Sequence, residues 1–172
     1  GGIKIVLHRK FEGKIKNSTV SKTPSGKYYI SVLVETDAEN TKCKKPTESK
    51  TLGIDLGIKD FATFSDGTTI GNPKHFSRRQ KMLKRAQRKM SRKKKGSKNR
   101  DKQRIKVAKL YEKVTNCRKD FLHKLTRNLA ENQSYTSLAI EDLDVKGMVE
   151  KRKKSKLSGK INDVGWGMFR TF

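Results

Sequence analysis

The chain has 172 residues and a formal net charge of +26, from 43 Lys and Arg residues against 17 Asp and Glu residues. Only 32% of the residues are hydrophobic, so any core is modest, and the apolar runs are too short to span a bilayer. This excess of cations favours nucleic acid as the partner, because each neutralised phosphate releases a counterion. We therefore expect no membrane and no small-molecule substrate. A basic membrane-surface protein is a weaker alternative, since the most basic segment lacks bulky apolar residues.

The first 36 residues are predicted to form strands. "IKIVLHR", residues 3–9, is one strand, and residues 13–22 and 27–36 flank the turn sequence "TPSG" as a hairpin. Both faces of the hairpin are fairly apolar, which favours a small barrel or a sheet that is covered on both sides.

Residues 37–50 are polar, aperiodic and contain a proline, so we interpret them as a linker. The linker includes Cys43, and the other cysteine, Cys117, lies far away in the sequence. Because no CxxC pair exists, zinc is not expected.

A second sheet is predicted from residue 51 onward. "TLGIDL", "DFATFSD" and "TTIG" are three short strands with a turn at Asp66-Gly67, and "YTSLAIEDL", residues 135–143, is a fourth. The last segment, "INDVGWGMFRTF", has a helical pattern, with Asn162 or Asp163 as the predicted N-cap.

A basic helical hairpin is predicted over about residues 74–132, with a break at 95–99. No acid lies between Phe76 and Arg100, whereas a solvated helix usually intersperses acids with its bases. Residues 77–110 also contain no aromatic side chain, so the hairpin suits phosphate contacts better than base stacking. The residues predicted to bind nucleic acid are Arg78, Arg79, Lys81, Lys84, Arg85, Arg88, Lys89, Arg92, Lys93 and Lys94.

Two acids lie near strand ends, Asp55 in "TLGIDL" and Glu141 in "SLAIEDL". The helical hairpin between them supplies the crossover that a parallel pairing needs, and that pairing would bring the two carboxylates side by side. Buried together they would raise each other's pKa, and a divalent metal would relieve this. Carboxylates suit Mg²⁺ or Mn²⁺, and two such ions support phosphodiester cleavage. The alternative is a non-catalytic basic nucleic-acid-binding protein in which Asp55 and Glu141 are structural.

Several ordered blocks resemble the TnpB (OrfB) family, which comprises transposon-encoded RNA-guided DNA endonucleases related to type V CRISPR effectors. The blocks are "GIDLGIKDFATFSDG", the basic segment through "KGSKNRDKQRIKVAKLYEKVTNCRKDFLHKLT", "IEDLDVKGM" and "INDVGWGMFR". The resemblance covers residues 51–172 and implies an α/β, RNase H-like nuclease domain of RuvC type, with a mixed sheet and an inserted basic helical hairpin. Residues 1–36 resemble, more weakly, the last strands of the wedge-type β-barrel domain that precedes it.

The resemblance also assigns roles. Asp55 and Glu141 match two catalytic, metal-ligating acids, and the implied partners are guide RNA and DNA, in the cytoplasm and at the nucleoid. The family's third aspartate and its zinc ribbon have no counterpart here. We therefore expect a fragment of such an endonuclease whose catalytic centre is incomplete and which is inactive alone.

Overall fold

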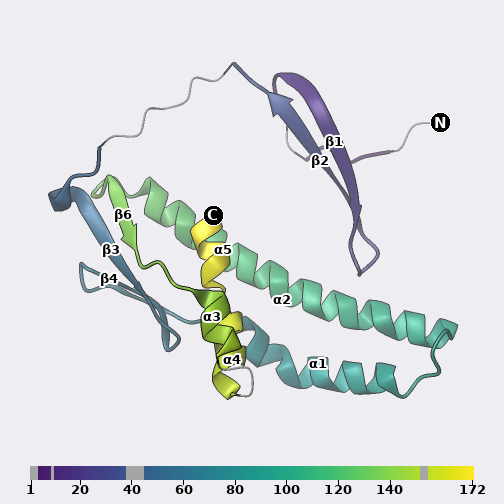
Figure 1. Ribbon diagram of the computed structural model, residues 1–172. Coiled ribbons are helices and arrows are strands. Elements are labelled where there is room, and N and C mark those ends of the chain that lie inside the picture. Colours follow the sequence, from purple (N-terminus) through teal and green to yellow (C-terminus); the bar gives the residue numbers. More distant parts are fainter. Residues whose placement is uncertain (1–3, 9, 38–44, 152–154) are drawn as a thin grey trace. The chain divides into compact units, whose positions relative to one another are not determined.

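The hairpin near the N-terminus belongs to the first of two compact units, Gly1–Cys43 and Lys44–Phe172, into which the chain divides. The computed structural model describes residues 4–8, 10–37, 45–151 and 155–172 (Figure 1). In the first unit, β1 (Lys14–Lys22) pairs antiparallel with β2 (Tyr28–Glu35). This confirms the predicted hairpin around "TPSG".

One other prediction for the first unit is wrong. Residues 4–8 have no regular secondary structure, so the strand expected over 3–9 is not formed there. Within this chain both faces of the hairpin are exposed, since Val20 and Leu33 are 60% and 63% exposed. Two strands by themselves cannot bury a face, so the barrel to which these strands are assigned stays a prediction.

The second unit contains a four-stranded mixed sheet in the order β5-β4-β3-β6. The first three strands, β3 (Thr51–Leu56), β4 (Asp60–Phe64) and β5 (Thr69–Gly71), form an antiparallel meander. β6 (Ser137–Ile140) pairs with β3 in parallel. The fold is therefore mixed α/β, and the four strands lie where the sequence predicted them.

The segment predicted as a linker is only partly described. Its residues 48–50 form a short 3₁₀ helix, η1 (Glu48–Lys50), directly before β3. Residues 38–44, which include Cys43, lie outside the described residues.

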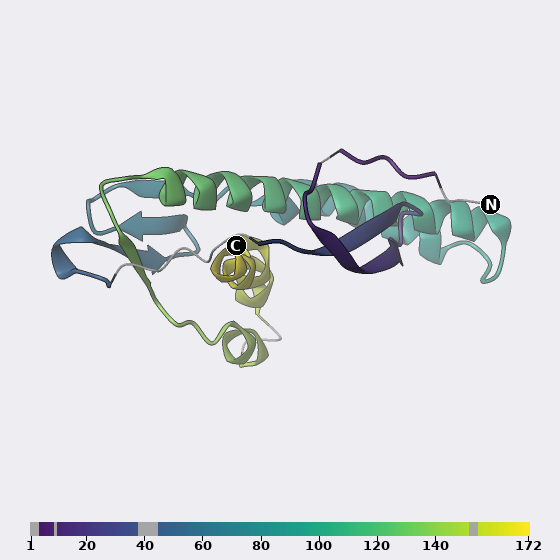
Figure 2. The ribbon, with the colours of Figure 1, turned by 90° about the horizontal axis from the view of Figure 1, so that it is seen from above.

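Two long helices, α1 (His75–Ser91) and α2 (Lys98–Glu131), connect β5 to β6. They run alongside each other in Figure 1, and they overlap when seen from above in Figure 2. Ser97 caps α2 by accepting a hydrogen bond from the Arg100 amide. The Arg100 guanidinium in turn donates to the carbonyls of Met90 and Lys93, at 3.0 and 3.1 Å, and so satisfies the C-terminal end of α1. The predicted helical hairpin is confirmed, and its turn is fixed by hydrogen bonds.

The core forms where α2 and the C-terminal helices cover one face of the sheet. Phe61 is fully buried, and its ring meets those of Phe121 and Phe169 edge-on, with centroids 5.2 Å apart in each case. Leu52 and Leu122 pack in the same cluster. Trp166 and Phe169 are each only 4% exposed, so both aromatic residues pack in the core.

Three short helices end the chain: α3 (Val145–Glu150), α4 (Lys156–Val164) and α5 (Trp166–Thr171). The prediction that Asn162 or Asp163 caps this last segment is wrong. Ser155 caps α4, and Gly165 separates α4 from α5 in a left-handed conformation with φ 84°. Asp163 lies inside α4, and its side chain caps a different helix. In the parts of the chain that the structure covers, no helix is both long and apolar enough to cross a membrane.

Candidate active site and nucleic-acid interface

The parallel ladder between β3 and β6 aligns the two predicted acids. Its last pair is Ile54 with Ile140; Asp55 comes next within β3, and Glu141 comes directly after the end of β6. The carboxylates therefore lie at the same edge of the sheet, where both strands end. This is the juxtaposition that the sequence predicted from the crossover.

Asp55 and Glu141 are both exposed, so the expectation of two buried, mutually repelling carboxylates is wrong. The period of two does hold: Leu52, Ile54 and Leu56 are buried on one face of β3 while Asp55 points the other way. On that second face, none of the described residues buries Asp55. Water can therefore solvate the carboxylate, and no repulsion between buried charges arises.

Two adjacent carboxylates fit a hard divalent cation. Mg²⁺ is commonly held by one or two carboxylates, with waters and substrate phosphates completing its shell. Among the described residues, however, no group of three or more His, Cys, Asp or Glu side chains is arranged to hold a metal ion. Asp55 and Glu141 thus offer oxygen ligands of the right kind but form a minimal set.

Other acids near these strands have structural roles. Asp66 accepts hydrogen bonds from the Thr68 hydroxyl and amide, at 2.6 and 2.9 Å, and these bonds hold the pKa of Asp66 below its usual value. Asp144 caps α3 through the Gly147 amide, and Asp142 pairs with Arg170. These residues are therefore poor candidates for metal binding.

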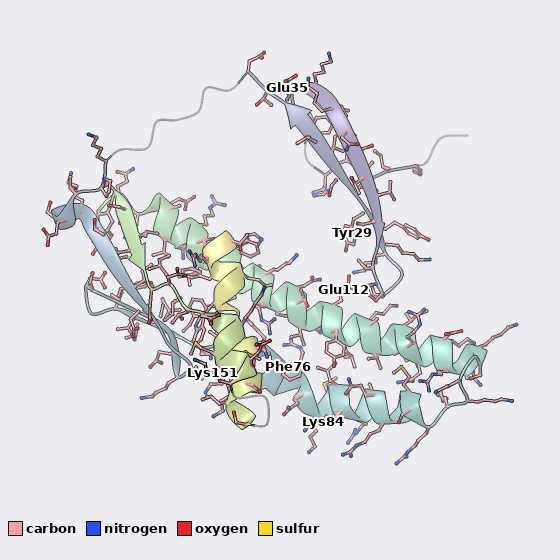
Figure 3. The ribbon with its side chains drawn as sticks, in the orientation of Figure 1. Tyr29, Glu35, Phe76, Lys84, Glu112 and Lys151 are labelled. Carbon is pink, nitrogen blue, oxygen red and sulfur yellow. The ribbon has the colours of Figure 1, made fainter. Side chains whose placement is uncertain are left out.

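A cationic stripe runs along α1. Six of the ten residues predicted to bind nucleic acid line one hollow of about 610 Å³: Lys81, Lys84, Arg85, Arg88, Lys89 and Arg92. Their spacing of three, four, seven and eight places them on one face of the helix. Figure 3 shows Lys84 on the side of α1 that faces away from α2. We refer to these six residues as the α1 stripe.

The other four predicted residues lie at the two ends of the stripe. Arg78 and Arg79 are in the first turns of α1, and Lys93 and Lys94 follow the helix in the turn before α2. No acid is present on α1, so no ion pair within the helix competes for these side chains.

A second hollow, of about 550 Å³, lies between α1 and α2 and shares Arg85 and Lys89 with the α1 stripe. Met82, Ala86 and Leu110 give it an apolar lining, and Lys106, Lys109 and Lys113 come from α2. These lysines do not form an uninterrupted basic run in the sequence, because acids are interspersed along α2. A helical wheel of α2 would have placed them on one face at steps of three and four.

The base of the hairpin is held by Asp163, which sequence reasoning assigned to a cap of its own helix. Its carboxylate accepts from the backbone amides of Phe76 and Ser77, at 2.8 and 3.0 Å, and so caps the N-terminal end of α1. The Ser77 hydroxyl donates to the same group, and Arg118 of α2 binds it at 3.3 Å. The sequence did contain a sign that Asp163 is buried, because it lies between Ile161 and Val164 in an apolar segment.

Two of the histidines, His75 and His123, pack against aromatic rings. His75 lies against Phe121, and burial lowers its pKa from the usual value. His123 stacks on Phe172 at 4.0 Å between ring centroids.

Comparison with known proteins tests the family resemblance. The profile of the family OrfB_IS605, described as "Probable transposase", matches residues 29–152, which is more than half of the chain. The chain belongs to the OrfB_IS605 transposase family.

Two curated relatives agree with this family assignment. A Streptomyces pristinaespiralis protein named "Putative RNA-guided DNA endonuclease" is 42% identical over 154 residues, covering 89% of this chain and 36% of its own length. The Escherichia coli K12 protein "Putative RNA-guided DNA endonuclease InsQ" is 38% identical over 170 residues, covering 92% of this chain and 41% of its own length. This OrfB_IS605 chain therefore spans about two-fifths of the length of these relatives.

Proposed function

We propose that this chain carries part of an RNA-guided DNA endonuclease of RuvC type, with Asp55 and Glu141 as metal-ligating acids. The observation that carries the proposal is the parallel register of β3 and β6, which aligns the two carboxylates at one sheet edge. Membership of the OrfB_IS605 family and the names of the two relatives support an RNase H-like interpretation of the mixed sheet.

Asp55 and Glu141 would hold Mg²⁺ or Mn²⁺ through their carboxylate oxygens. When bound in such sites, divalent ions activate a water and stabilise the leaving oxygen of a phosphodiester. The chain's own contribution is to place the two acids directly after the last ladder pair of two neighbouring parallel strands. Because both side chains are exposed, a phosphodiester can reach them without a conformational change.

The α1 stripe supplies the second requirement, a surface for the nucleic acid. Six cations on one helical face suit phosphate contacts, which fix the orientation of a strand but do not read its sequence. Sequence selection would then come from base pairing with a guide RNA. The proposed partners are accordingly guide RNA and DNA, and the proposed place of action is the bacterial nucleoid.

A divalent-metal titration tests the two acids. Ligand that binds only the folded state raises stability by RT ln(1 + [L]/Kd), so Mg²⁺ or Mn²⁺ should raise the melting temperature of the unmodified chain. We expect Asp55→Ala and Glu141→Ala each to remove this shift, while Asp101→Ala, an exposed acid on α2, preserves it. Equal shifts in all four proteins would rule out a site at Asp55 and Glu141.

One observation favours a second function, that of a non-catalytic nucleic-acid-binding protein. In the described residues the two exposed acids have no third ligand beside them. This second function predicts that millimolar Mg²⁺ and Mn²⁺ leave the melting temperature unchanged while the chain still binds DNA or RNA.

A further inference from the structure

A hollow of about 420 Å³ lies at the base of the helical hairpin. It forms where three segments meet: the β3–β4 turn, the β5–α1 connection and α4. Its polar lining consists of Lys59, Asn72, Lys74, Ser77, Lys160 and Asp163. We refer to this hollow as the lysine pocket, because each of the three segments contributes one lysine.

The lysine pocket has a defined backbone framework. The Asn72 amide group donates to the Ile58 carbonyl at 2.8 Å, and its oxygen accepts from the Lys74 amide at 2.9 Å. Lys74 has φ 50°, and among the described residues it is the only one besides glycine with a positive φ. Asn72 therefore holds the β3–β4 turn and the start of α1 together, with one lysine on each.

The pocket is positively charged although it includes an acid. The Asp163 carboxylate is already occupied by the Phe76 and Ser77 amides, the Ser77 hydroxyl and the Arg118 guanidinium. Through the described parts of the chain, Lys59, Lys74 and Lys160 have no carboxylate at ion-pair distance. Three lysines thus line one hollow, and none of them is paired with a carboxylate among the described residues.

The pocket also lies close to the candidate active site. Lys59 follows Asp55 by four residues, so their Cα atoms are at most about 14 Å apart. One strand of a duplex advances ~3.4 Å per phosphate, so this separation corresponds to at most about four nucleotides.

We propose that the lysine pocket binds one backbone phosphate of the nucleic acid strand that passes Asp55 and Glu141. This inference rests on the proposed function and adds a positioning site to it. Lysine is a point-charge phosphate binder, and three lysines around one hollow can share a single phosphate. Ile58 and Leu157 complete the lining and give the adjoining sugar an apolar surface. None of the three lysines belongs to the basic run of α1, so the sequence alone did not indicate them.

The first test uses the unmodified chain, which avoids any effect of substitution on folding. Lysine acetylation by a small reagent is followed by mass spectrometry, with and without a short DNA duplex or an RNA–DNA hybrid. We expect the nucleic acid to protect Lys59, Lys74 and Lys160 several-fold, and to leave Lys119, Lys146 and Lys151 reactive. Protection of α1 stripe lysines without the pocket lysines would overturn the pocket and leave the proposed function intact.

The second test measures how binding depends on salt. Each phosphate contact contributes ~0.7–0.9 to the slope of log affinity against log salt. The triple variant K59Q/K74Q/K160Q should lose about one such contact and bind about tenfold more weakly. The control K119Q/K146Q/K151Q removes the same charge outside the pocket and should keep the slope. Loss of about three contacts in the first variant, or equal losses in both, contradicts a single shared phosphate.

The third arm separates backbone phosphate from free phosphate. Inorganic pyrophosphate is added in place of nucleic acid in the acetylation experiment. Protection by pyrophosphate at lower concentration than by DNA phosphate would assign the pocket to a free anion and refute the proposal. A chain that binds neither DNA nor RNA would refute both the pocket and the proposed function. The metal titration tests Asp55 and Glu141 alone, so a negative result there counts against the proposed metal site and not against phosphate binding in the pocket.

Discussion

The Asp163 carboxylate accepts hydrogen bonds from two helices that pack against its own. It satisfies two free amides at the start of α1 and pairs with Arg118 of α2, whose side chain is 17% exposed. Both carboxylate oxygens are used, and the Arg118 guanidinium also donates to the Asp163 carbonyl at 3.1 Å. Since Lys74, the N-cap residue of α1, makes no side-chain capping bond, the cap of α1 depends on a residue 87 positions away.

Replacing this carboxylate should therefore be costly. We expect Asp163→Ala to lower the free energy of unfolding by about 3 kcal/mol, because it leaves the Arg118 charge and two amide donors without a partner. Asp163→Asn keeps an acceptor and should cost about half as much. Urea unfolding monitored by circular dichroism measures both changes.

Asp101 provides the matched control for that comparison. Its ion pair with Arg104 joins side chains that are 64% and 57% exposed. Exposed pairs contribute little, so Asp101→Ala should change the stability by less than ~0.5 kcal/mol. Similar midpoints for Asp101→Ala and Asp163→Ala would show that the buried cap is not a major support of the fold.

At the scale of elements, the helical hairpin presents its cations on a rigid scaffold. Besides the Arg100 bonds at the turn, Gln87 donates to the Tyr111 hydroxyl at 2.8 Å and Gln103 donates to the Ala86 carbonyl at 3.3 Å. These contacts join α1 and α2 along their length. The cations of the α1 stripe are thus held on a supported helix, and they need not be ordered from a flexible chain when nucleic acid binds.

Neutralising the α1 stripe should weaken binding to all sequences alike. We expect the variant with glutamine at positions 85, 88, 89 and 92 to lower affinity at least tenfold at low salt and to flatten the salt dependence. Filter binding with two unrelated DNA sequences measures this. A variant with glutamine at four exposed basic positions, 119, 124, 127 and 146, is the charge-matched control. An unchanged salt slope in the stripe variant would contradict phosphate binding there.

Local patterns predicted these elements because each depends on nearby residues. Alternation and the Asp66-Gly67 turn identified β3 to β5, and the apolar repeat with Val107, Val114 and Leu122 identified α2. The alignment of Asp55 with Glu141 followed from one topological rule, that a helical crossover permits a parallel pair. The role of Asp163 could not be predicted in this way, since it depends on contacts with α1 and α2, both distant in the chain.

The exposure of the two acids has a similar explanation. The sequence indicates which face of β3 carries Asp55, but whether another layer covers that face depends on tertiary packing. The lysine pocket is also tertiary, because its three lysines come from segments separated by up to about a hundred residues. Residue type and spacing therefore indicated Asp55 and Glu141 as metal ligands. Their exposure, and the grouping of the three pocket lysines, could be learned only from the fold.

At the scale of the whole molecule, the net charge of +26 acts against compactness. Most of the named ion pairs join exposed side chains and contribute little, so they do not offset the repulsion among 43 cations. Raising the salt concentration shortens the screening length, to about 10 Å at 0.1 M, and reduces this repulsion. A bound polyanion neutralises the same charges more effectively, because it binds the folded surface where they converge.

We therefore expect the melting temperature to rise with sodium chloride, and to rise further with heparin at equal ionic strength. For a domain of this size, each 1 kcal/mol of added stability corresponds to roughly 2–4 °C. Differential scanning fluorimetry measures both effects, with uncharged dextran as the control polymer. If salt lowered the melting temperature, attractive ion pairs would outweigh the repulsion. If heparin did no more than salt, the cations of the α1 stripe and the lysine pocket would not act together as a polyanion surface.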